Sequence, residues 1–362
     1  MKRSQIVPVL QALLAAVLFG ASAPFSKLLL GQIQPVTLAG LLYLGCGFAA
    51  LLLLVFRSSV RRSAGQVDRA EASLNRSDLF WVGGAILCGG VFGPILLLVG
   101  LRQTPAATAS LLLNFESVAT VLIAALVFRE ATGRRVWFAI ALITVASAIL
   151  SWDRNGNWGV SLGAFAVLCA CLMWGIDNNL TRRISAKDPL AIVMVKGLVA
   201  GSFSLALSFW LGYSFPAARI ILLAMLLGAL SYGASIALFV LALRGLGAAR
   251  TGALYAIAPF VGALLAVLVL RESLTAQFLL SIPLLVIGAG LLVFEKHGHA
   301  HMHKLLEHEH SHRNDDPHHK HAHPGLSPDF QELDQHSHWH RHDQVTHDHA
   351  HTPDIHHWHE HN

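Results

Sequence analysis

Two stretches of this 362-residue chain are copies of one another. The 31 residues from Gly100 to Glu130 align with those from Ala242 to Glu272, 142 positions later, and eleven aligned positions are identical. Both copies contain an apolar run that ends in an Arg-Glu pair, and a run of about twenty apolar residues crosses the hydrocarbon core of a bilayer as a helix. The chain therefore contains a duplicated set of predicted membrane-spanning helices, a pattern typical of transporters.

The overall composition also indicates a lipid environment. Hydrophobic residues make up 54% of the chain and charged residues 13%, whereas about a quarter of the residues in a soluble domain are charged. The net charge of +5 comes mostly from arginines at loop ends, which favours a topology signal over a nucleic-acid surface. The sequence has no zinc-enzyme spacing, nucleophile elbow or phosphate loop, so we expect neither an enzyme nor a required cofactor.

The predicted fold class is an all-α membrane protein with ten transmembrane helices. Each apolar run is long enough to cross the hydrocarbon core, and the whole chain is an integral multi-pass protein of the plasma or inner membrane. The predicted spans are residues 7–30, 35–56, 79–101, 105–128, 134–152, 158–181, 189–212, 218–243, 247–270 and 274–294.

Basic residues orient these spans. With a cytoplasmic amino end, the inner loops hold Arg57, Arg61, Arg62, Arg69, Arg76, Arg129, Arg134, Arg135, Arg182, Arg183, Lys187, Arg244 and Arg250. The outer loops and flanks hold Lys27, Arg102, Arg154, Arg219 and Arg271. Because cytoplasmic loops carry the excess of Lys and Arg, this asymmetry predicts that both termini are cytoplasmic.

Five spans per copy is an odd number, so the second copy is predicted to enter the membrane inverted, with Arg102 outside and Arg244 inside. The first and sixth spans support this alignment at three pairs of positions: Gly20 and Gly175, Lys27 and Arg182, Pro35 and Pro189. Two inverted bundles can open a site between them alternately to either side. The predicted organisation is a first repeat over 1–152, a second over 153–295, and a tail over 296–362.

The five-span halves and the segments Leu122–Glu130 and Leu264–Glu272 resemble the EamA repeats of the drug/metabolite transporter superfamily. The resemblance covers residues 7–294 and implies a bundle in which the first four spans of each repeat surround a central cavity. It also implies transport of small organic solutes. The chain departs from the family pattern at Asn114–Ser117, where the second copy has an apolar segment containing Pro259 and the first copy has a carboxylate instead.

That carboxylate, Glu116, lies at the middle of the fourth span. A charge facing lipid at this depth costs about 2.5 kcal/mol or more on insertion scales, so we expect Glu116 to face a cavity or a partner. Substrate binding or proton coupling is the functional interpretation, and a hydrogen bond that ties two helices is the structural one. Asn114, two residues earlier, is also a candidate but lies on a different helical face.

Asp177 and Lys196 are two further charges within spans, and with Glu116 and Asn114 they are the candidates for substrate binding or coupling. Asp177 and Lys196 are predicted at comparable depth, so either an Asp177–Lys196 ion pair or a Glu116–Lys196 pair would lower the insertion cost. The alternative for Lys196 is that its ammonium group reaches the inner interface. Asn178 and Asn179 are interpreted as a polar helix end. Lys27, at the outer end of the first span, is predicted to be an interface anchor.

The third span is rich in glycine, and Gly89 and Gly93 have the GxxxG spacing that lets helices approach closely. Close packing is favoured here over the alternative, a broken helix lining the substrate path.

All 22 histidines follow residue 296, many of them as His-x-His. We predict a disordered tail able to bind zinc, nickel, cobalt or copper, because clustered neutral imidazoles suit these ions. The competing interpretation is a solvated tail that gains charge as the cytoplasm acidifies. The predicted metal ligands are His299, His301, His303, His308, His310, His312, His336, His338, His340, His342, His347, His349 and His351.

The leading functional hypothesis is a secondary transporter of small organic solutes that works by alternating access and carries a metal-binding tail. One alternative is a divalent-metal transporter fed by the tail, although the spans contain no histidine and few carboxylates. The other is a receptor or scaffold that transports nothing. The expected partners are a small-molecule substrate and the lipid bilayer, without nucleic acid, and the sequence is compatible with a homodimer.

Overall fold

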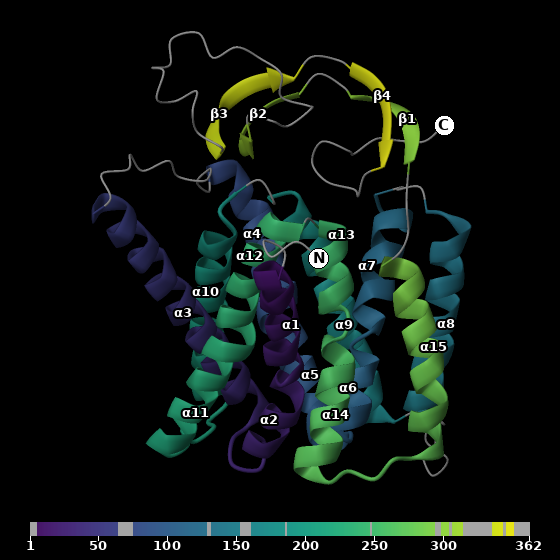
Figure 1. Cartoon of the computed structure of the whole chain (residues 1–362). Helices are drawn as coiled ribbons and strands as arrows, with labels where there is room; N and C mark the ends of the chain where they lie inside the picture. Colours follow the sequence, from purple (N-terminus) through teal and green to yellow (C-terminus); the bar gives the residue numbers. More distant parts are fainter. Residues whose placement is uncertain are drawn as a thin grey trace.

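The computed structural model of the chain is a bundle of long helices (Figure 1). It describes residues 6–63, 75–128, 132–152, 161–184, 187–246 and 248–293, and four tail segments, 298–303, 306–313, 335–342 and 345–350. The predicted all-α membrane fold is confirmed by the long apolar helices of this bundle.

The helices of the first half are α1 (Ile6–Gly20), α2 (Ser22–Leu29), α3 (Pro35–Ser63), the short 3₁₀ turn η2 (Arg76–Asp78), α4 (Leu79–Ala85), the π-helix η3 (Ile86–Phe92), α5 (Gly93–Gln103), α6 (Ala106–Leu112), α7 (Phe115–Leu126) and α8 (Arg134–Ser151). Those of the second half are α9 (Leu162–Arg182), α10 (Pro189–Trp210), α11 (Ala218–Gly228), the π-helix η4 (Ala229–Ala234), α12 (Ser235–Leu246), α13 (Ala248–Tyr255), α14 (Ala258–Leu270) and α15 (Ala276–Val293).

Within these described ranges, nine helical segments are long and apolar enough to cross a membrane. They correspond to the first nine predicted spans, and most of their ends lie within a few residues of the predicted ones. The tenth predicted span, 274–294, corresponds to the shorter apolar helix Ala276–Leu292. Helices of this length and composition define a multi-pass integral membrane protein.

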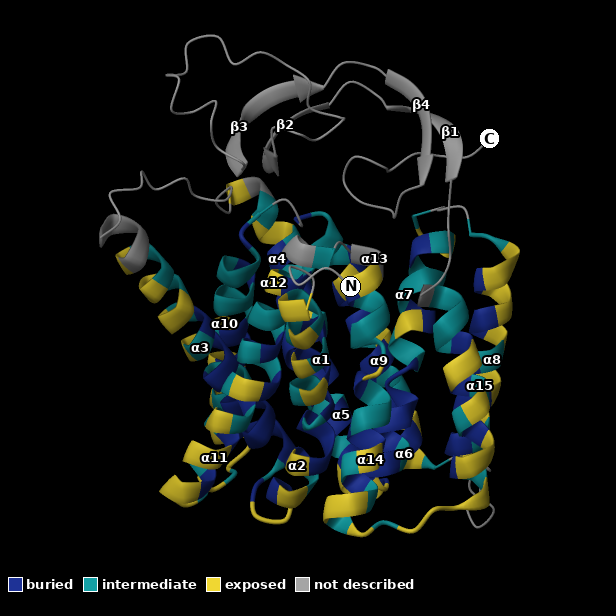
Figure 2. Cartoon of the chain, viewed as in Figure 1, coloured by how far each residue is buried: buried dark blue, intermediate teal, exposed yellow. Residues whose placement is uncertain are grey.

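Burial follows the pattern expected for a bundle in lipid (Figure 2). The contacts between helices combine large aliphatic side chains, such as the buried Leu38 and Leu98, with small ones, such as Ala12 and Ala15. Large apolar side chains are exposed on the outside, where Phe80 is 77% and Trp210 81% exposed. Exposing these apolar surfaces would be unfavourable in water but costs nothing in the hydrocarbon of a bilayer. Where small residues lie between helices, they allow the backbones to approach closely.

The two halves contain the same irregularities at equivalent positions. η3 interrupts the third span and η4 interrupts the eighth, with starts 143 residues apart, at Ile86 and Ala229. The fourth span is divided between α6 and α7, and the ninth is divided between α13 and α14. Such interruptions disturb the regular hydrogen bonds of a helix and are uncommon. Because they recur at equivalent positions, the repeat is present in the structure as well as in the sequence.

The first and sixth spans run in opposite directions. Gly163, at the start of α9, packs against Thr104 and Gly100 at the end of α5, where a Cβ on Gly163 would lie 2.2 Å from the Thr104 hydroxyl oxygen. The Thr104 carbonyl in turn accepts a hydrogen bond of 2.9 Å from Lys27, near the end of α2. The α1–α2 span therefore ends at the side of the bundle where α9 begins.

Glycines make two equivalent close crossings between the halves. A Cβ on Gly20 would lie 2.4 Å from the carbonyl oxygen of Ala258, and Gly20 and Gly262 pack against each other, so α1 meets α14 with almost no side chain between them. Gly175 of α9 packs in the same way against α7, where a Cβ would lie 2.8 Å from Ala119 Cβ. Both aligned glycines, Gly20 and Gly175, therefore serve helix contact.

Four short segments of the tail form strands, and disorder of the tail as a whole stays a prediction. β1 (Gly298–His303) pairs with β4 (Val345–Ala350), and β2 (Leu306–Arg313) pairs with β3 (Gln335–His342), both antiparallel. The alternation of His-x-His has the period of a strand rather than of a helix, which accounts for the extended backbone. Among the predicted ligands, His351 lies outside the described residues.

Candidate functional site

Glu116 lies where the fourth span is interrupted. The helix tightens here: the backbone amides of Asn114 and Glu116 bond three residues back, to the carbonyls of Leu111 and Leu113, at 3.2 and 3.1 Å. α7 then begins at Phe115, so Glu116 falls in its first turn. The amides of Glu116 and Ser117 are thus bonded to the carbonyls of Leu113 and Asn114, so the backbone at the start of α7 offers neither of these amides to the Glu116 carboxylate.

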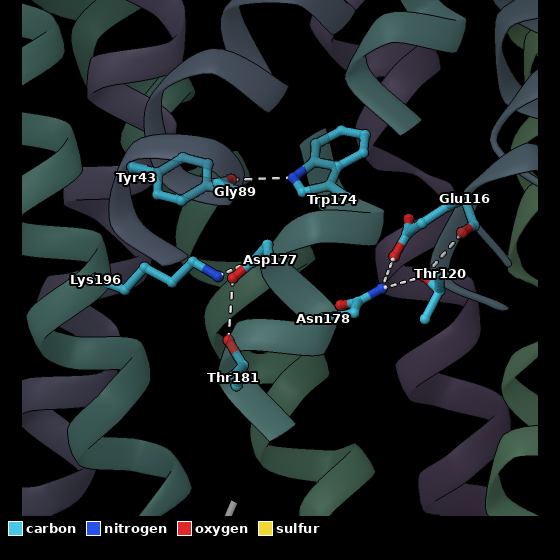
Figure 3. Close-up of polar contacts among 9 residues, drawn as sticks. All are labelled: Tyr43, Gly89, Glu116, Thr120, Trp174, Asp177, Asn178, Thr181 and Lys196. Carbon is cyan, nitrogen blue, oxygen red and sulfur yellow. Dashed lines mark hydrogen bonds and ion pairs between the residues drawn. The ribbon is translucent and has the colours of Figure 1, made fainter. Parts of the chain in front are cut away.

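A network of hydrogen bonds joins Glu116 to α9 (Figure 3). The side-chain amide of Asn178 donates to Glu116 Oε1 at 2.9 Å and also lies 3.1 Å from the Thr120 hydroxyl oxygen. Asn179 donates to the backbone carbonyls of Thr120 and Gly175 at 3.0 and 2.8 Å. The two asparagines therefore join the sixth span to the fourth, and their interpretation as a simple helix end is wrong.

Asp177 bonds to a different neighbour. Its carboxylate forms an ion pair with Lys196 of α10 and accepts a hydrogen bond of 3.0 Å from the Thr181 hydroxyl. Of the two pairings that the sequence allowed for Lys196, the structure contains the one with Asp177. Adjacent residues on a helix point about 100° apart, so Asp177 and Asn178 connect α9 to α10 and to α7 respectively (Figure 3).

The backbone carbonyl of Gly89, within η3, accepts hydrogen bonds from two side chains. The Tyr43 hydroxyl donates to it at 2.6 Å and the Trp174 indole N–H at 3.0 Å. Asp177 packs directly on Gly89, because a Cβ at that position would lie 1.9 Å from Asp177 Oδ2. Gly93 likewise packs against Trp174. Gly89 and Gly93 therefore pack closely as expected, but η3 also interrupts the span here, so the alternative of a broken helix lining a substrate path stays open. Tyr43 and Trp174 carried no signal in the sequence.

Aromatic rings from both halves gather around Tyr232 and Tyr255. The Phe19 ring centroid lies 5.9 Å from that of Tyr232 and 5.6 Å from that of Tyr255. Tyr43 packs on Tyr232 at 5.8 Å and Phe239 on Tyr255 at 4.8 Å. These five rings are half-buried. We refer to them as the aromatic cluster.

Two other predicted residues make hydrogen bonds to backbone carbonyls. Asn114 is buried, and its side-chain amide donates to the Leu111 carbonyl at 2.9 Å, within its own turn of helix. Lys27 donates to the carbonyls of Leu101, Arg102 and Thr104 at the end of α5. The structure therefore brings Glu116, Asp177 and Lys196 to the two sides of α9 but gives Asn114 no hydrogen bond to them.

Glu272, from the repeated Arg-Glu pair, caps a helix of the other half. Its two carboxylate oxygens accept hydrogen bonds of 2.7 and 2.8 Å from the backbone amides of Ala106 and Ala107, at the start of α6. Its equivalent, Glu130, lies outside the described residues. In the part of the chain whose side chains the structure describes, no group of three or more His, Cys, Asp or Glu is arranged to hold a metal ion.

Interrupted apolar spans with charged side chains between them are a feature that helical membrane proteins of the transporter class share. Comparison with known proteins gives the family: the EamA-like transporter family matches residues 6–152 and again 161–294, so the chain belongs to it.

An uncharacterized transporter of Methanothermobacter thermautotrophicus is 30% identical over 268 residues, which cover 71% of this chain and 78% of the relative. A probable 4-amino-4-deoxy-L-arabinose-phosphoundecaprenol flippase subunit, ArnE, of Klebsiella pneumoniae is 33% identical over 106 residues, or 27% of this chain and 93% of that protein. One solved crystal structure matches with a TM-score of 0.55 and 17% identity, over 80% of this chain and 96% of the other, a likeness in fold alone.

Proposed function

We propose that this chain is a secondary transporter that moves small organic solutes across the plasma or inner membrane by alternating access. The observation that carries the proposal is the pair of interrupted helices, α6–α7 and α13–α14, at equivalent positions of two halves that begin at opposite sides of the bundle. Interrupted helices at the middle of inverted repeats are where transporters bind substrate and coupling ions.

In this proposal the ten predicted spans form two inverted five-span repeats, over 1–152 and 153–295, and both termini are cytoplasmic. The distribution of basic residues supports this orientation. Reporter fusions in the loops near Arg102 and Arg244 test it. Opposite compartments are expected, and a shared compartment would rule out the inverted arrangement.

Glu116 is assigned to substrate binding or coupling, and Asp177 and Lys196 to holding α9 and α10 in register beside it. The support for Glu116 is its bond to Asn178 across the fourth and sixth spans, one from each half. A group shared by both halves changes its surroundings when the halves move against each other, which is what coupling requires.

Reconstitution tests this function. Untargeted analysis of solutes retained by cells with and without the protein selects candidates, and exchange of these solutes is then measured in vesicles containing the purified full chain. We expect exchange that Glu116→Gln reduces about tenfold or more and that Asp78→Asn, a change outside the spans, leaves intact. If no candidate solute is exchanged by the wild-type protein, the chain is not a transporter.

The tail is proposed to bind zinc, nickel, cobalt or copper. Its strands support this because the register places histidine opposite histidine: His308 and His340, His310 and His338, His312 and His336, His299 and His349, His301 and His347. Zinc titration of the full chain and of a chain ending at 295 tests this, and equal binding by both would contradict it.

A further inference from the structure

The turn between α5 and α6 is held by charged side chains from the first and ninth spans. Lys27, near the end of α2, donates to three backbone carbonyls at the end of α5. Glu272, which follows α14, accepts at 2.7 and 2.8 Å from the first two backbone amides of α6. A cation therefore binds the carbonyl end of one helix and an anion binds the amide end of the next, so each matches the partial charge that it contacts.

The backbone that leads to Glu272 has an uncommon conformation. Arg271 ends α14 in the left-handed region, with φ 55° and ψ 37°. In the described part of the chain it is the one non-glycine residue with a positive φ. A residue with a Cβ adopts this conformation where the surrounding structure requires it. Here it ends the helix directly before Glu272, whose carboxylate reaches across to α6.

The equivalent helix contacts differ between the two sides of the bundle. At the α5–α6 turn, on the predicted outer side, α2 packs against both α5 and α6, and α14 packs against α6. The repeat relates α5 to α12, α6 to α13, α14 to α7 and the end of α2 to the end of α9. Among the described helices, neither α12 nor α13 packs along α9 or α7 in return. The contact between these spans therefore occurs on one side of the bundle.

Other equivalent contacts occur in both halves. α5 packs along α9, and its counterpart α12 packs along α1. α7 packs on α9, and its counterpart α14 packs on α1. The aromatic cluster also joins α12 and α13 to α1, through the rings of Phe19, Tyr255 and Phe239. The difference between the two sides is thus a property of particular contacts, as expected for one of the two states of an alternating-access protein.

We propose that Lys27 and Glu272 form a gate that closes the predicted outer side by holding the α5–α6 turn against α2 and α14. This inference rests on the proposed alternating access, and it assigns the side chains that release the turn when the outer side opens. Opening breaks the hydrogen bonds of both side chains. Their strength therefore sets the fraction of molecules that are open to the outside.

Ser110 is a suitable reporter of opening. It lies about one helical turn deeper in α6 than the amides that Glu272 binds, and it is 1% exposed. Its hydroxyl oxygen lies 2.9 Å from the position of a Cβ on Gly262 of α14, so separation of α6 from α14 uncovers it. In Ser110→Cys, the rate of labelling by a membrane-impermeant thiol reagent, added outside right-side-out membrane vesicles, measures the open fraction. Matched chains that keep Ser110 correct for the four native cysteines.

Variants of the gate should increase this labelling. Lys27→Met and Glu272→Gln should each raise the rate for Ser110→Cys about tenfold or more, because each loses charge-assisted hydrogen bonds that exist in the closed state. Lys27→Arg, which keeps the positive charge at the end of α5, should stay within about threefold of the wild type. Arg102→Met is the matched control. It removes a charge from the same turn, but its bond to Gln34 is exposed, so the rate should change by no more than about twofold.

A second reporter separates gating from a general loss of stability. Ser147 is 2% exposed in α8, which packs on α15. Faster labelling of Ser110→Cys with unchanged labelling of Ser147→Cys supports the gate. Faster labelling of both reporters means that Lys27 and Glu272 only stabilise the fold, and this result overturns the gate. Equal labelling of Ser110→Cys in the wild type and the gate variants overturns it as well, as does an increase seen only with reagent on the cytoplasmic face.

The labelling needs no transported solute, so the gate and the transport function are tested separately. Gate-dependent labelling in a chain that exchanges no solute supports the gate and overturns transport. Solute exchange by a chain whose labelling does not depend on Lys27 or Glu272 overturns the gate alone.

Discussion

Neutralising Asp177 should destabilise the bundle by leaving a lysine without its counter-charge inside a membrane span. Asp177 is 5% exposed, and its carboxylate pairs with Lys196 and accepts from Thr181 at 3.0 Å. Asp177→Asn is the suitable change because it keeps the side-chain volume where Asp177 packs on Gly89. Any loss of stability can then be attributed to charge rather than to a steric clash.

The size of the effect follows from burial. Counting side-chain atoms alone, Asp177 is 7% and Lys196 18% exposed. Losing one partner of a buried ion pair lowers the free energy of unfolding by about 3–5 kcal/mol, and losing one of an exposed pair by about 0–1 kcal/mol, so this pair lies closer to the buried limit. Lys196 is the more exposed member, and a lysine can move its ammonium group toward water. We therefore expect the lower end, about 3 kcal/mol. Replacing both members, with Asp177→Asn and Lys196→Met, should cost no more than about 1 kcal/mol.

A double-mutant cycle measures this coupling. The purified wild type, both single variants and the double variant are unfolded in mixed micelles with increasing detergent denaturant, and the free energy of unfolding is read from tryptophan fluorescence. The expected interaction energy is about 2 kcal/mol or more, because the double variant restores electrical balance. Single variants that each cost less than about 1 kcal/mol and add without coupling would refute this account of the pair.

Four further outcomes follow from the contacts. Glu272→Ala should lower the free energy of unfolding by about 1–3 kcal/mol, because two amides of α6 lose a charged acceptor; an unchanged unfolding midpoint would show that water replaces it. Gly262→Ala should cost about 1–3 kcal/mol in the same titration, since its Cβ would lie 2.7 Å from the Gly20 carbonyl oxygen, and a neutral result would mean that the helices separate easily. Tyr43→Phe should cost about 1 kcal/mol or less, because Trp174 still donates to the Gly89 carbonyl; a larger loss would indicate that the two donors act together. Removal of residues 296–362 should abolish multisite zinc binding measured by calorimetry and leave solute exchange intact, and loss of exchange would connect the tail to transport.

The sequence predicted most of the architecture because lipid imposes simple rules. A span needs a sufficiently long apolar run, and a duplicated run repeats its structure, so the positions of the long helices followed from hydrophobicity and from the 142-residue repeat. The interruption of the ninth span had a visible signal in Pro259, which lacks the N–H needed within a helix. The interruption of the fourth span, at Asn114, had only a weaker one, the polar run from Asn114 to Ser117.

Much of the site depended on how the helices are rotated about their axes. The spans are apolar on nearly every face, so hydrophobic periodicity, which orients helices in soluble proteins, carries little information here. Glu116, Asp177 and Lys196 were identified as candidates by their charge and depth alone. That Asp177 rather than Glu116 pairs with Lys196 was decided by the packing of both α9 and α10 on η3.

By itself, then, the sequence determined the lipid environment, the apolar spans and the duplication, since these depend on composition and order along the chain. Only the tertiary structure determined that Asn178 bonds Glu116, that Tyr43 and Trp174 meet at Gly89, and that Glu272 caps a helix of the other half. Each of these contacts joins residues at least 46 positions apart. These contacts form only when each helix has the right depth in the membrane and the right rotation about its axis. Neither quantity follows from the type of a residue and its neighbours in sequence.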